Sequence, residues 1–369
     1  MNERIDAGDF PSAVYLVAEK GEIVLHEALG YAVVEPERIE AKLDTIYDLA
    51  SLTKVLVTGL LYAKFLQDDG FYSIDTTIIK LFRQLKGTEK RSITVRNLVS
   101  HTSGLRDWYP FYSVFFDPRY KTAAAVSTAL ELPAVYPMDS KVVYSDLNFI
   151  ILGADLADRI PSGNLAELAL NDIFQPLKLE RTFFRPSIEY RREIAATEKG
   201  NQFEEQTCQE KYPEIHIPHS AFRNYQIWGE VHDGNADFMN GIAGHAGLFS
   251  TAEETFKIAQ QFLPNYTTLL KPETCELFRT NFTPGMNEHR SFAFQLASTP
   301  DSTAGTKMSP ESFGHLGFTG TSLWIDPVKE RVFILLTNRT HNHCLPFENI
   351  NSVRRRFHDL AIEYLDKNS

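Results

Sequence analysis

The sequence predicts an α/β protein of the α+β type, in which one antiparallel sheet built from both ends of the chain is flanked by helices and joined to an all-α lobe. β-rich runs lie near the N-terminus and in the final third, and helical periodicity dominates the segment between them. The 369 residues also exceed one typical core. We therefore expect an α/β lobe from residues 1–50 and 238–369, and a mainly helical lobe from residues 51–237.

The first part of the chain predicts a β-hairpin that leads into the helical region. Residues 13–19 and 22–30 are β-rich runs, and Lys20-Gly21 between them is typical of a tight turn. Apolar residues recur at helical spacing from Lys54 onward. This spacing predicts helices over residues 122–131, 145–160, 165–177, 252–263 and 272–280.

The final third predicts strands again. Residues 348–365 carry apolar side chains at helical spacing and predict a closing helix. The polar segment 188–237 lacks clear periodicity, so we expect a loop-rich insertion there. Short apolar runs separated by turn residues predict strands over residues 291–298, 312–318, 322–326 and 331–337.

Composition and charge narrow the class of protein. A formal net charge of −11 argues against a nucleic-acid or anionic-membrane partner. The three cysteines are widely spaced and predict no disulfide framework. The most apolar stretch, residues 49–66, contains Lys54 and Lys64, so we expect a buried helix and no membrane span. The first residues form no secretory signal, which favours a cytoplasmic protein; the alternative is a secreted protein whose leader has been removed.

Ser51 and Lys54 form the most informative pair in the sequence. They lie where a strand-like run, residues 45–50, gives way to a helical pattern, and their spacing places both side chains on one helix face. A serine hydroxyl is a weak nucleophile that a nearby amine can activate, and N–H groups at a helix N-terminus can stabilise an oxyanion. The alternative, which the spacing alone favours, is an N-cap serine followed by a surface lysine.

Tyr144-Ser145-Asp146 opens the helix expected over residues 145–160. In one interpretation Ser145 or Asp146 caps that helix and Tyr144 only ends a strand. In the other, a lysine ammonium beside Tyr144 lowers the pKa of its phenol, so that the phenolate can accept a proton from a serine hydroxyl. Capping accounts for Asp146, but it gives no reason for a tyrosine at the junction.

Residues 314–324 place three glycines among β-prone residues. Glycine in a strand marks positions where a ligand or another backbone comes close. An edge strand here could supply a second oxyanion donor, which we place at the backbone N–H of Phe318. The alternative is a glycine-rich hairpin in which His315 is hydrogen-bonded and takes no part in chemistry.

Taken in order, these segments resemble the serine β-lactamase and penicillin-binding protein superfamily, in the branch of class C β-lactamases, DD-peptidases and related esterases. The resemblance covers residues 13–365 and implies a β-lactamase/transpeptidase-like fold with its site in a cleft between two lobes. It rests on five ordered strings, at residues 48–54, 98–105, 144–146, 244–251 and 314–324.

The resemblance also implies a set of chemical roles. Ser51 would be the nucleophile, Lys54 its activating amine and Tyr144 the general base. The backbone N–H groups of Ser51 and Phe318 would form the oxyanion hole, and water would release the acyl group. No metal and no organic cofactor is implied.

Three positions, His315, Leu316 and Asp146, depart from the pattern usual in the antibiotic-hydrolysing members. The string at residues 315–317 is His-Leu-Gly instead of Lys-Thr-Gly, so a permanent positive charge and a hydroxyl donor are missing. Losing a charge-assisted contact costs about 1.5–3 kcal/mol, which predicts weak or no β-lactamase activity. Asp146 stands where asparagine is common, and its charge should hold Lys54 protonated while opposing the phenolate of Tyr144.

Substrate contacts are expected from side chains near these strings. Trp108 opens an aromatic stretch, residues 108–116, that either walls the cleft against an apolar acyl group or packs between the lobes. His245 lies in a glycine-rich turn and either borders the site or is buried and hydrogen-bonded. The residues expected to contact substrate are Asp146, His315, Gly317, Trp108 and His245.

The sequence thus predicts a cofactor-independent serine hydrolase that acts on a small molecule through an acyl-enzyme at Ser51. A small ester or amide is the preferred substrate, D-amino-acid peptides come next and β-lactams third. The alternatives are a non-catalytic or penicillin-binding sensor on the same scaffold and a true class C-like β-lactamase. A metallohydrolase is disfavoured because the histidines at 216, 219, 341 and 343 lie on no clear helix and no His-Glu-x-x-His string occurs.

Overall fold

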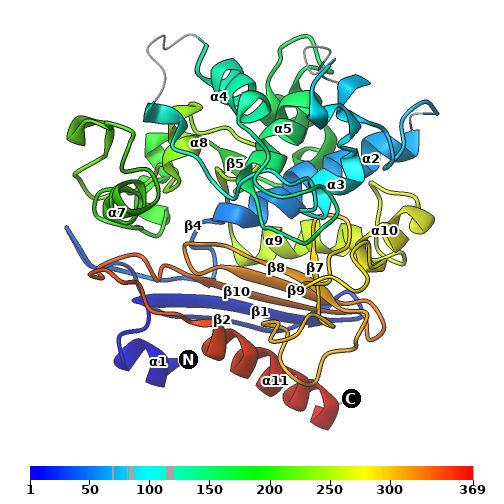
Figure 1. Ribbon diagram of the computed structural model, residues 1–369. Coiled ribbons are helices and arrows are strands. Elements are labelled where there is room, and N and C mark those ends of the chain that lie inside the picture. Colours follow the sequence, from blue (N-terminus) through cyan, green and yellow to red (C-terminus); the bar gives the residue numbers. More distant parts are fainter. Residues whose placement is uncertain (69, 81, 83–86, 114–119, 369) are drawn as a thin grey trace.

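A computed structural model describes residues 1–68, 70–80, 82, 87–113 and 120–368. One sheet dominates it (Figure 1), and its strands are β1 (Ser12–Glu19), β2 (Glu22–Val33), β3 (Ile39–Glu40), β7 (Gln295–Leu296), β8 (Phe313–Leu316), β9 (Ser322–Asp326) and β10 (Arg331–Thr337). The strand order is β3-β2-β1-β10-β9-β8-β7, and every neighbouring pair is antiparallel. The predicted sheet from both ends of the chain is therefore confirmed.

Helices cover both faces of the sheet (Figure 1). Helices α1 (Asn2–Asp6) and α11 (Asn351–Asn368) lie on one face, and α9 (Ala252–Ala259) packs against β1 and β10 on the other. Strand β10 is buried along its whole length for this reason. A strand buried on both faces can be apolar throughout, as the run Val-Phe-Ile-Leu-Leu in β10 is.

Alternating side chains of the sheet enter two different cores. Ile334 and Leu336 of β10 belong to the larger core, which continues into the helical layer. Phe333 and Leu335, which point the other way, pack in a smaller core with Phe357 of α11. The period of two along the strand produces this division.

The remaining helices form a layer above α9 in Figure 1. A short second sheet, β4 (Tyr47–Asp48), β6 (Leu248–Ser250) and β5 (Phe183–Phe184) in that order, joins this layer. Strand β4 lies in the strand-like run predicted at residues 45–50, whereas β5 and β6 have no counterpart in the sequence prediction. The helices are α2 (Leu60–Asp68), α3 (Val95–Val99), α4 (Lys121–Glu131), α5 (Asp146–Ala157), α6 (Leu165–Ala169), α7 (Gln202–Lys211), α8 (Gly234–Phe238) and α10 (Glu276–Arg279).

The predicted strand over residues 291–298 is wrong over most of its length, because only β7 is extended. The N–H of Ser291 instead donates to the carbonyl of Phe294 at 3.0 Å, and Ala293 has a positive φ of 70°. The segment 188–237 contains α7 and α8 as well as loops. The sequence did not reveal α7 because its residues, Gln-Phe-Glu-Glu-Gln-Thr-Cys-Gln-Glu-Lys, are almost all polar.

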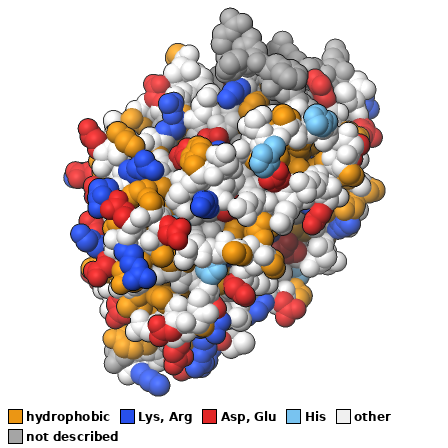
Figure 2. Space-filling view, turned by 90° about the vertical axis from the view of Figure 1, so that its left-hand side faces the viewer, with side chains coloured by type: hydrophobic (Ala, Val, Ile, Leu, Met, Phe, Trp, Pro, Cys, Tyr) orange, Lys and Arg blue, Asp and Glu red, His pale blue; other side chains and the backbone are white. Residues whose placement is uncertain are grey.

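None of the helices in the described ranges is long and apolar enough to cross a membrane. On the face shown in Figure 2, acidic and basic side chains are interspersed with apolar ones, so that face carries no field of a single sign. The division into two lobes at residues 51 and 238 stays a prediction.

Candidate active site

A cavity of about 650 Å³ lies between the end of β8 and the helical layer. Of the residues predicted to form the site, Lys54 and His245 lie just behind its wall. The others all line it, namely Ser51, Trp108, Tyr144, Asp146, His315, Gly317 and Phe318. Residues distant in the sequence thus meet in one cavity.

Ser51 lies in a tight turn between β4 and the helical layer. The turn is a 3₁₀ segment, Ala50–Leu52, which continues into a π-helix, Lys54–Gly59, before α2 begins. Wide π turns are rare and often occur at functional sites. Ala50, next to Ser51, has a positive φ of 47°, which costs a residue other than glycine about 1–2 kcal/mol. The helix predicted from Lys54 is therefore present, but its first turns are not α-helical.

Lys54 is completely buried and contacts Ser51 directly. Its Nζ donates to Ser51 Oγ at 2.8 Å and to the carbonyl of His245 at 3.1 Å, and it forms an ion pair with Asp146 Oδ1 at 2.8 Å. Burial by itself lowers the pKa of Lys54, but the attraction of Asp146 and Tyr144 outweighs it, so the pKa is raised. Lys54 is therefore an ammonium at neutral pH.

Tyr144 lies against both members of this pair. Lys54 Nζ is 5.0 Å from the centre of the Tyr144 ring, and the Tyr144 hydroxyl hydrogen-bonds with Lys54 and Ser51. Burial raises the pKa of Tyr144; the ammonium of Lys54 opposes that rise and the carboxylate of Asp146 adds to it. The net pKa is raised, so Tyr144 is a neutral phenol at neutral pH.

The capping interpretation of Ser145 is wrong. Ser145 is the N-cap residue of α5, but its side chain donates to the carbonyl of Arg106 at 2.6 Å and makes no capping bond. Asp146 begins the helix, where a negative charge is favourable, and its carboxylate also faces Lys54. Asp146 therefore fits both the structural and the functional interpretation.

Two buried histidines flank Tyr144, and both are neutral. Burial first, then the positive charges of Lys54 and Arg290, hold the pKa values of His101 and His315 well below the usual range. His101 Nδ1 accepts the N–H of Ser145 at 3.0 Å, so its proton is on Nε2. His315 Nδ1 contacts the carbonyl of Leu316 at 2.9 Å and must donate, which leaves Nε2 as an acceptor without a described partner.

Trp108 and His245 are placed differently. Trp108 lines the cavity, and its ring lies 6.1 Å from that of Tyr212, so it both walls the cleft and packs against a neighbour. The last residues of its aromatic stretch, 114–116, lie outside the described residues. The His245 ring is buried and lies 3.0 Å from Asp233 Oδ1, so only its carbonyl contacts Lys54.

The glycine-rich strand end packs tightly against the Ser51 turn. A Cβ on Gly317 would lie 2.6 Å from the carbonyl oxygen of Leu49, so only glycine allows this approach. Thr321 Oγ1 also donates to that oxygen, at 3.1 Å. Within the described part of the chain no hydrogen bond from the N–H of Phe318 is present, which agrees with its predicted role as an oxyanion donor.

The sequence did not identify several residues that line the cavity. Arg290 lies with its guanidinium carbon 5.5 Å from the Tyr144 ring centre and is 5% exposed. Phe203 and Glu204 come from the unpredicted helix α7, and burial next to Asp233 raises the pKa of Glu204 to about 7. The string at residues 98–105 could have drawn attention to His101; for the others the sequence offers no comparable signal.

Three ligand atoms close to Lys54 could in principle surround a cation. One carboxylate oxygen of Asp146, one of Asp233 and one ring nitrogen of His245 lie within 4.8 Å of one another. The Lys54 ammonium already neutralises Asp146 at 2.8 Å, and the His245 ring lies beside Asp233. The arrangement is accounted for by these pairs, so the residues give no reason to invoke a metal.

The antiparallel sheet, its helical layer and the pairing of Ser51 with the buried Lys54 define a serine hydrolase of the β-lactamase-related superfamily. The chain belongs to the Beta-lactamase family, whose model matches residues 1–353. A protein of Escherichia coli K12 named "Putative D-alanyl-D-alanine carboxypeptidase" is 28% identical over 93% of this chain and 81% of its own length.

Two solved structures are similar in fold. The octameric penicillin-binding protein homologue of Pyrococcus abyssi has a TM-score of 0.72 and 17% identity, over 98% of this chain and 75% of that chain. EstCE1, described as a hydrolase with promiscuous acyltransferase activity, has a TM-score of 0.70 and 17% identity, over 97% of this chain and 96% of that chain. The predicted β-lactamase/transpeptidase-like fold is therefore confirmed.

Proposed function

We propose that this hydrolase forms an acyl-enzyme on Ser51 and acts on D-amino-acid peptides that end in a carboxylate, D-alanyl-D-alanine peptides first. The observation that carries the chemistry is the bond from the buried Lys54 Nζ to Ser51 Oγ, 2.8 Å long, at the wall of a cavity large enough for a peptide. The name of the Escherichia coli relative supports the same reaction.

Tyr144 is the proposed proton carrier. Ser51 Oγ attacks the scissile carbonyl, its proton passes to the phenolate of Tyr144, and the N–H groups of Ser51 and Phe318 hold the oxyanion. Tyr144 then protonates the amine that leaves, and water releases the acyl group by the reverse sequence. Because the pKa of Tyr144 is raised, the phenolate is a minor form at pH 7. The rate should therefore rise with pH, and the Lys54 ammonium stabilises the phenolate when it forms.

Basic side chains in the cavity offer contacts for a carboxylate on the substrate, although five acidic residues line it too, namely Asp107, Asp146, Glu204, Glu210 and Asp233. His315 brings no positive charge, but Arg290, Arg339 and Arg354 all line the same cavity. Within the described ranges Arg339 and Arg354 form no ion pair and donate to backbone carbonyls, those of Phe318 and Gly317, and burial lowers the pKa of Arg354 to about 9. Arg290 lies beside the Tyr144 ring and is the proposed contact for the carboxylate of the leaving amino acid, although its guanidinium also pairs with Glu288 at 2.6 Å.

The test combines labelling of Ser51 with a pair of matched peptides. Intact mass spectrometry after exposure to a labelled penicillin and a fluorophosphonate should give an adduct that is absent in Ser51→Ala. The peptide that ends in a free D-alanine carboxylate should be cleaved faster than the same peptide with a C-terminal amide. Arg290→Gln should remove this preference by lowering kcat/KM about tenfold to hundredfold for the carboxylate peptide only. Arg192→Gln, at an exposed ion pair with Glu37, is the control.

Ester hydrolysis is the second candidate, because Trp108, Phe203 and Phe318 give the cavity an apolar side. A p-nitrophenyl ester turned over faster than any carboxylate-bearing peptide, with no change in Arg290→Gln, would make the esterase the better assignment. A stable penicillin adduct without turnover of any substrate would instead favour the sensor alternative.

A further inference from the structure

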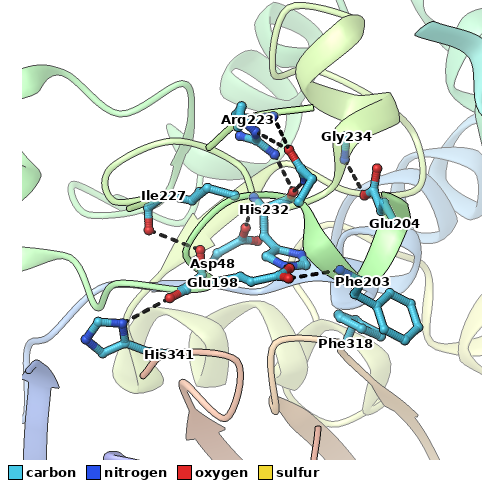
Figure 3. A network of polar contacts seen from close by, with 12 residues as sticks. Asp48, Glu198, Phe203, Glu204, Arg223, Ile227, His232, Gly234, Phe318 and His341 are labelled. Atoms are coloured by element: carbon cyan, nitrogen blue, oxygen red, sulfur yellow. Dashed lines mark hydrogen bonds and ion pairs between the residues drawn. The ribbon is translucent and has the colours of Figure 1, made fainter. Parts of the chain in front are cut away.

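Asp48 belongs to a buried polar network that also contains His232 and Glu198 (Figure 3). Its side chain is 2% exposed; Oδ1 accepts the N–H of Ala50 at 2.8 Å, and Oδ2 accepts the N–H of His232 at 2.7 Å. Its carbonyl oxygen accepts the hydroxyl of Thr319 at 2.8 Å. Asp48 thus bonds to three chain segments that reach the cavity, through its carboxylate to Ala50 and His232 and through its backbone carbonyl to Thr319.

Two of these contacts adjoin the backbone groups that stabilise the oxyanion in the proposed mechanism. Ala50 directly precedes Ser51 and is held at a positive φ of 47°, a conformation that its neighbours must enforce. Thr319 directly follows Phe318. A shift of Asp48 would therefore move both oxyanion donors relative to each other.

His232 extends the network to the Phe318 side chain. Their ring centres are 5.4 Å apart with an angle of 23° between the planes, and His232 Nε2 lies 2.8 Å from Glu198 Oε2. The other oxygen of Glu198 accepts the N–H of Phe203 at 3.0 Å, and the Phe203 ring packs 4.8 Å from that of Phe318. Phe318 is consequently held by its side chain as well as by its neighbour Thr319.

We propose that Asp48 is a positioning residue, which fixes the N–H groups of Ser51 and Phe318 at the separation that an oxyanion requires, and that His232 holds Phe318 in place for it. This inference rests on the proposed function. A misplaced donor weakens binding of the transition state more than binding of the substrate, so the network should act on kcat and leave KM nearly unchanged.

The experiment compares Asp48→Asn with a matched pair at Thr319. In Asp48→Asn the amide NH₂ cannot accept one of the two backbone N–H groups. Thr319→Val removes the hydroxyl that donates to the backbone carbonyl of Asp48, and Thr319→Ser keeps that hydroxyl. For each variant, kcat is measured per Ser51 titrated with an acylating ester, and the inhibition constant of a boronic acid, which forms a tetrahedral adduct, is compared with KM.

We expect kcat per titrated site to fall about tenfold to hundredfold in Asp48→Asn and Thr319→Val, since complete loss of one oxyanion donor costs about 10²–10³. KM should stay within about threefold, boronic-acid affinity should fall together with kcat, and Thr319→Ser should stay close to wild type. Unchanged kcat per site in the Thr319→Val variant, or equal losses in both Thr319 variants, would overturn the inference even if Asp48→Asn fails to fold. A wild type that is never labelled at Ser51 would refute the proposed function instead.

Discussion

Replacing Asp146 by asparagine should shift the pH dependence of the reaction to lower pH. Asp146 Oδ1 lies 2.8 Å from Lys54 Nζ, and at an effective dielectric constant of about 20 two unit charges at that distance attract each other by about 6 kcal/mol. The Asp146 side chain is 17% exposed and its charge is shared by two oxygens, so roughly a third of this value, about 2 kcal/mol, is realistic. That corresponds to about 1.5 pKa units.

The direction of the shift in the pH profile follows from the two pKa values that Asp146 influences, those of Lys54 and Tyr144. Its carboxylate favours the ammonium of Lys54 and disfavours the phenolate of Tyr144, so removing the charge lets both groups lose their protons at lower pH. The apparent pKa of the rising limb of kcat/KM for a chromogenic ester, measured from pH 6 to 10.5, should decrease by about 1–2 units, whatever the change in maximal rate.

Asp172→Asn is the matched control, because Asp172 pairs with Lys64 at 3.4 Å away from the cavity. Its profile should coincide with that of the wild type. A folded Asp146→Asn enzyme with an unchanged apparent pKa would refute the electrostatic reasoning, and with it the assignment of the rising limb to the Lys54–Tyr144 pair.

Three further predictions concern the strand end, the cavity wall and the core. Gly317→Ala should lower kcat/KM at least tenfold per titrated site, because its Cβ would lie 2.6 Å from the Leu49 carbonyl oxygen and push the strand end away. Glu204→Gln should stabilise the protein increasingly as pH rises from about 4.5 to 7, because the folded-state pKa of Glu204, raised to about 7, makes its ionisation costly in the folded protein. The measurement is the urea midpoint of variant and wild type at pH 5 and at pH 8. An equal difference between the two proteins at both pH values would contradict the prediction. Ile334→Ala, in the fully buried centre of β10, should cost about 2–5 kcal/mol in the free energy of unfolding, measured by urea denaturation.

The fold was predictable where local pattern and tertiary environment agree. β9 and β10 have the predicted bounds, Ser322–Asp326 and Arg331–Thr337, because short apolar runs between turns become buried strands. Helix α7 was not predictable, since its backbone is held by contacts such as Phe203 N–H to Glu198 and not by an apolar stripe of its own. Tertiary contacts decide polar segments of this kind.

The candidate site divides in the same way. Ser51, Lys54 and Tyr144 stand in short strings whose spacing already indicates chemistry. Arg290 and His232 carry no such signal, because their importance depends on which distant segment each one faces. The electrostatics were partly predictable. The sequence indicated that the carboxylate of Asp146 lies beside Lys54, but it did not indicate that Arg290 brings a positive charge to a cavity in which His315 is neutral.

The pairing of β1 with β10 has a consequence for how the chain is made. Ala13 pairs with Thr337, so a strand synthesised among the first residues must wait for one synthesised near the end. Until then the N-terminal hairpin leaves the ribosome with an apolar, unpaired edge, which is a site for aggregation. Pairings so distant in sequence also slow folding. A chain that stops before residue 331 would therefore keep this edge open, and we expect such fragments to be inactive and to depend on chaperones.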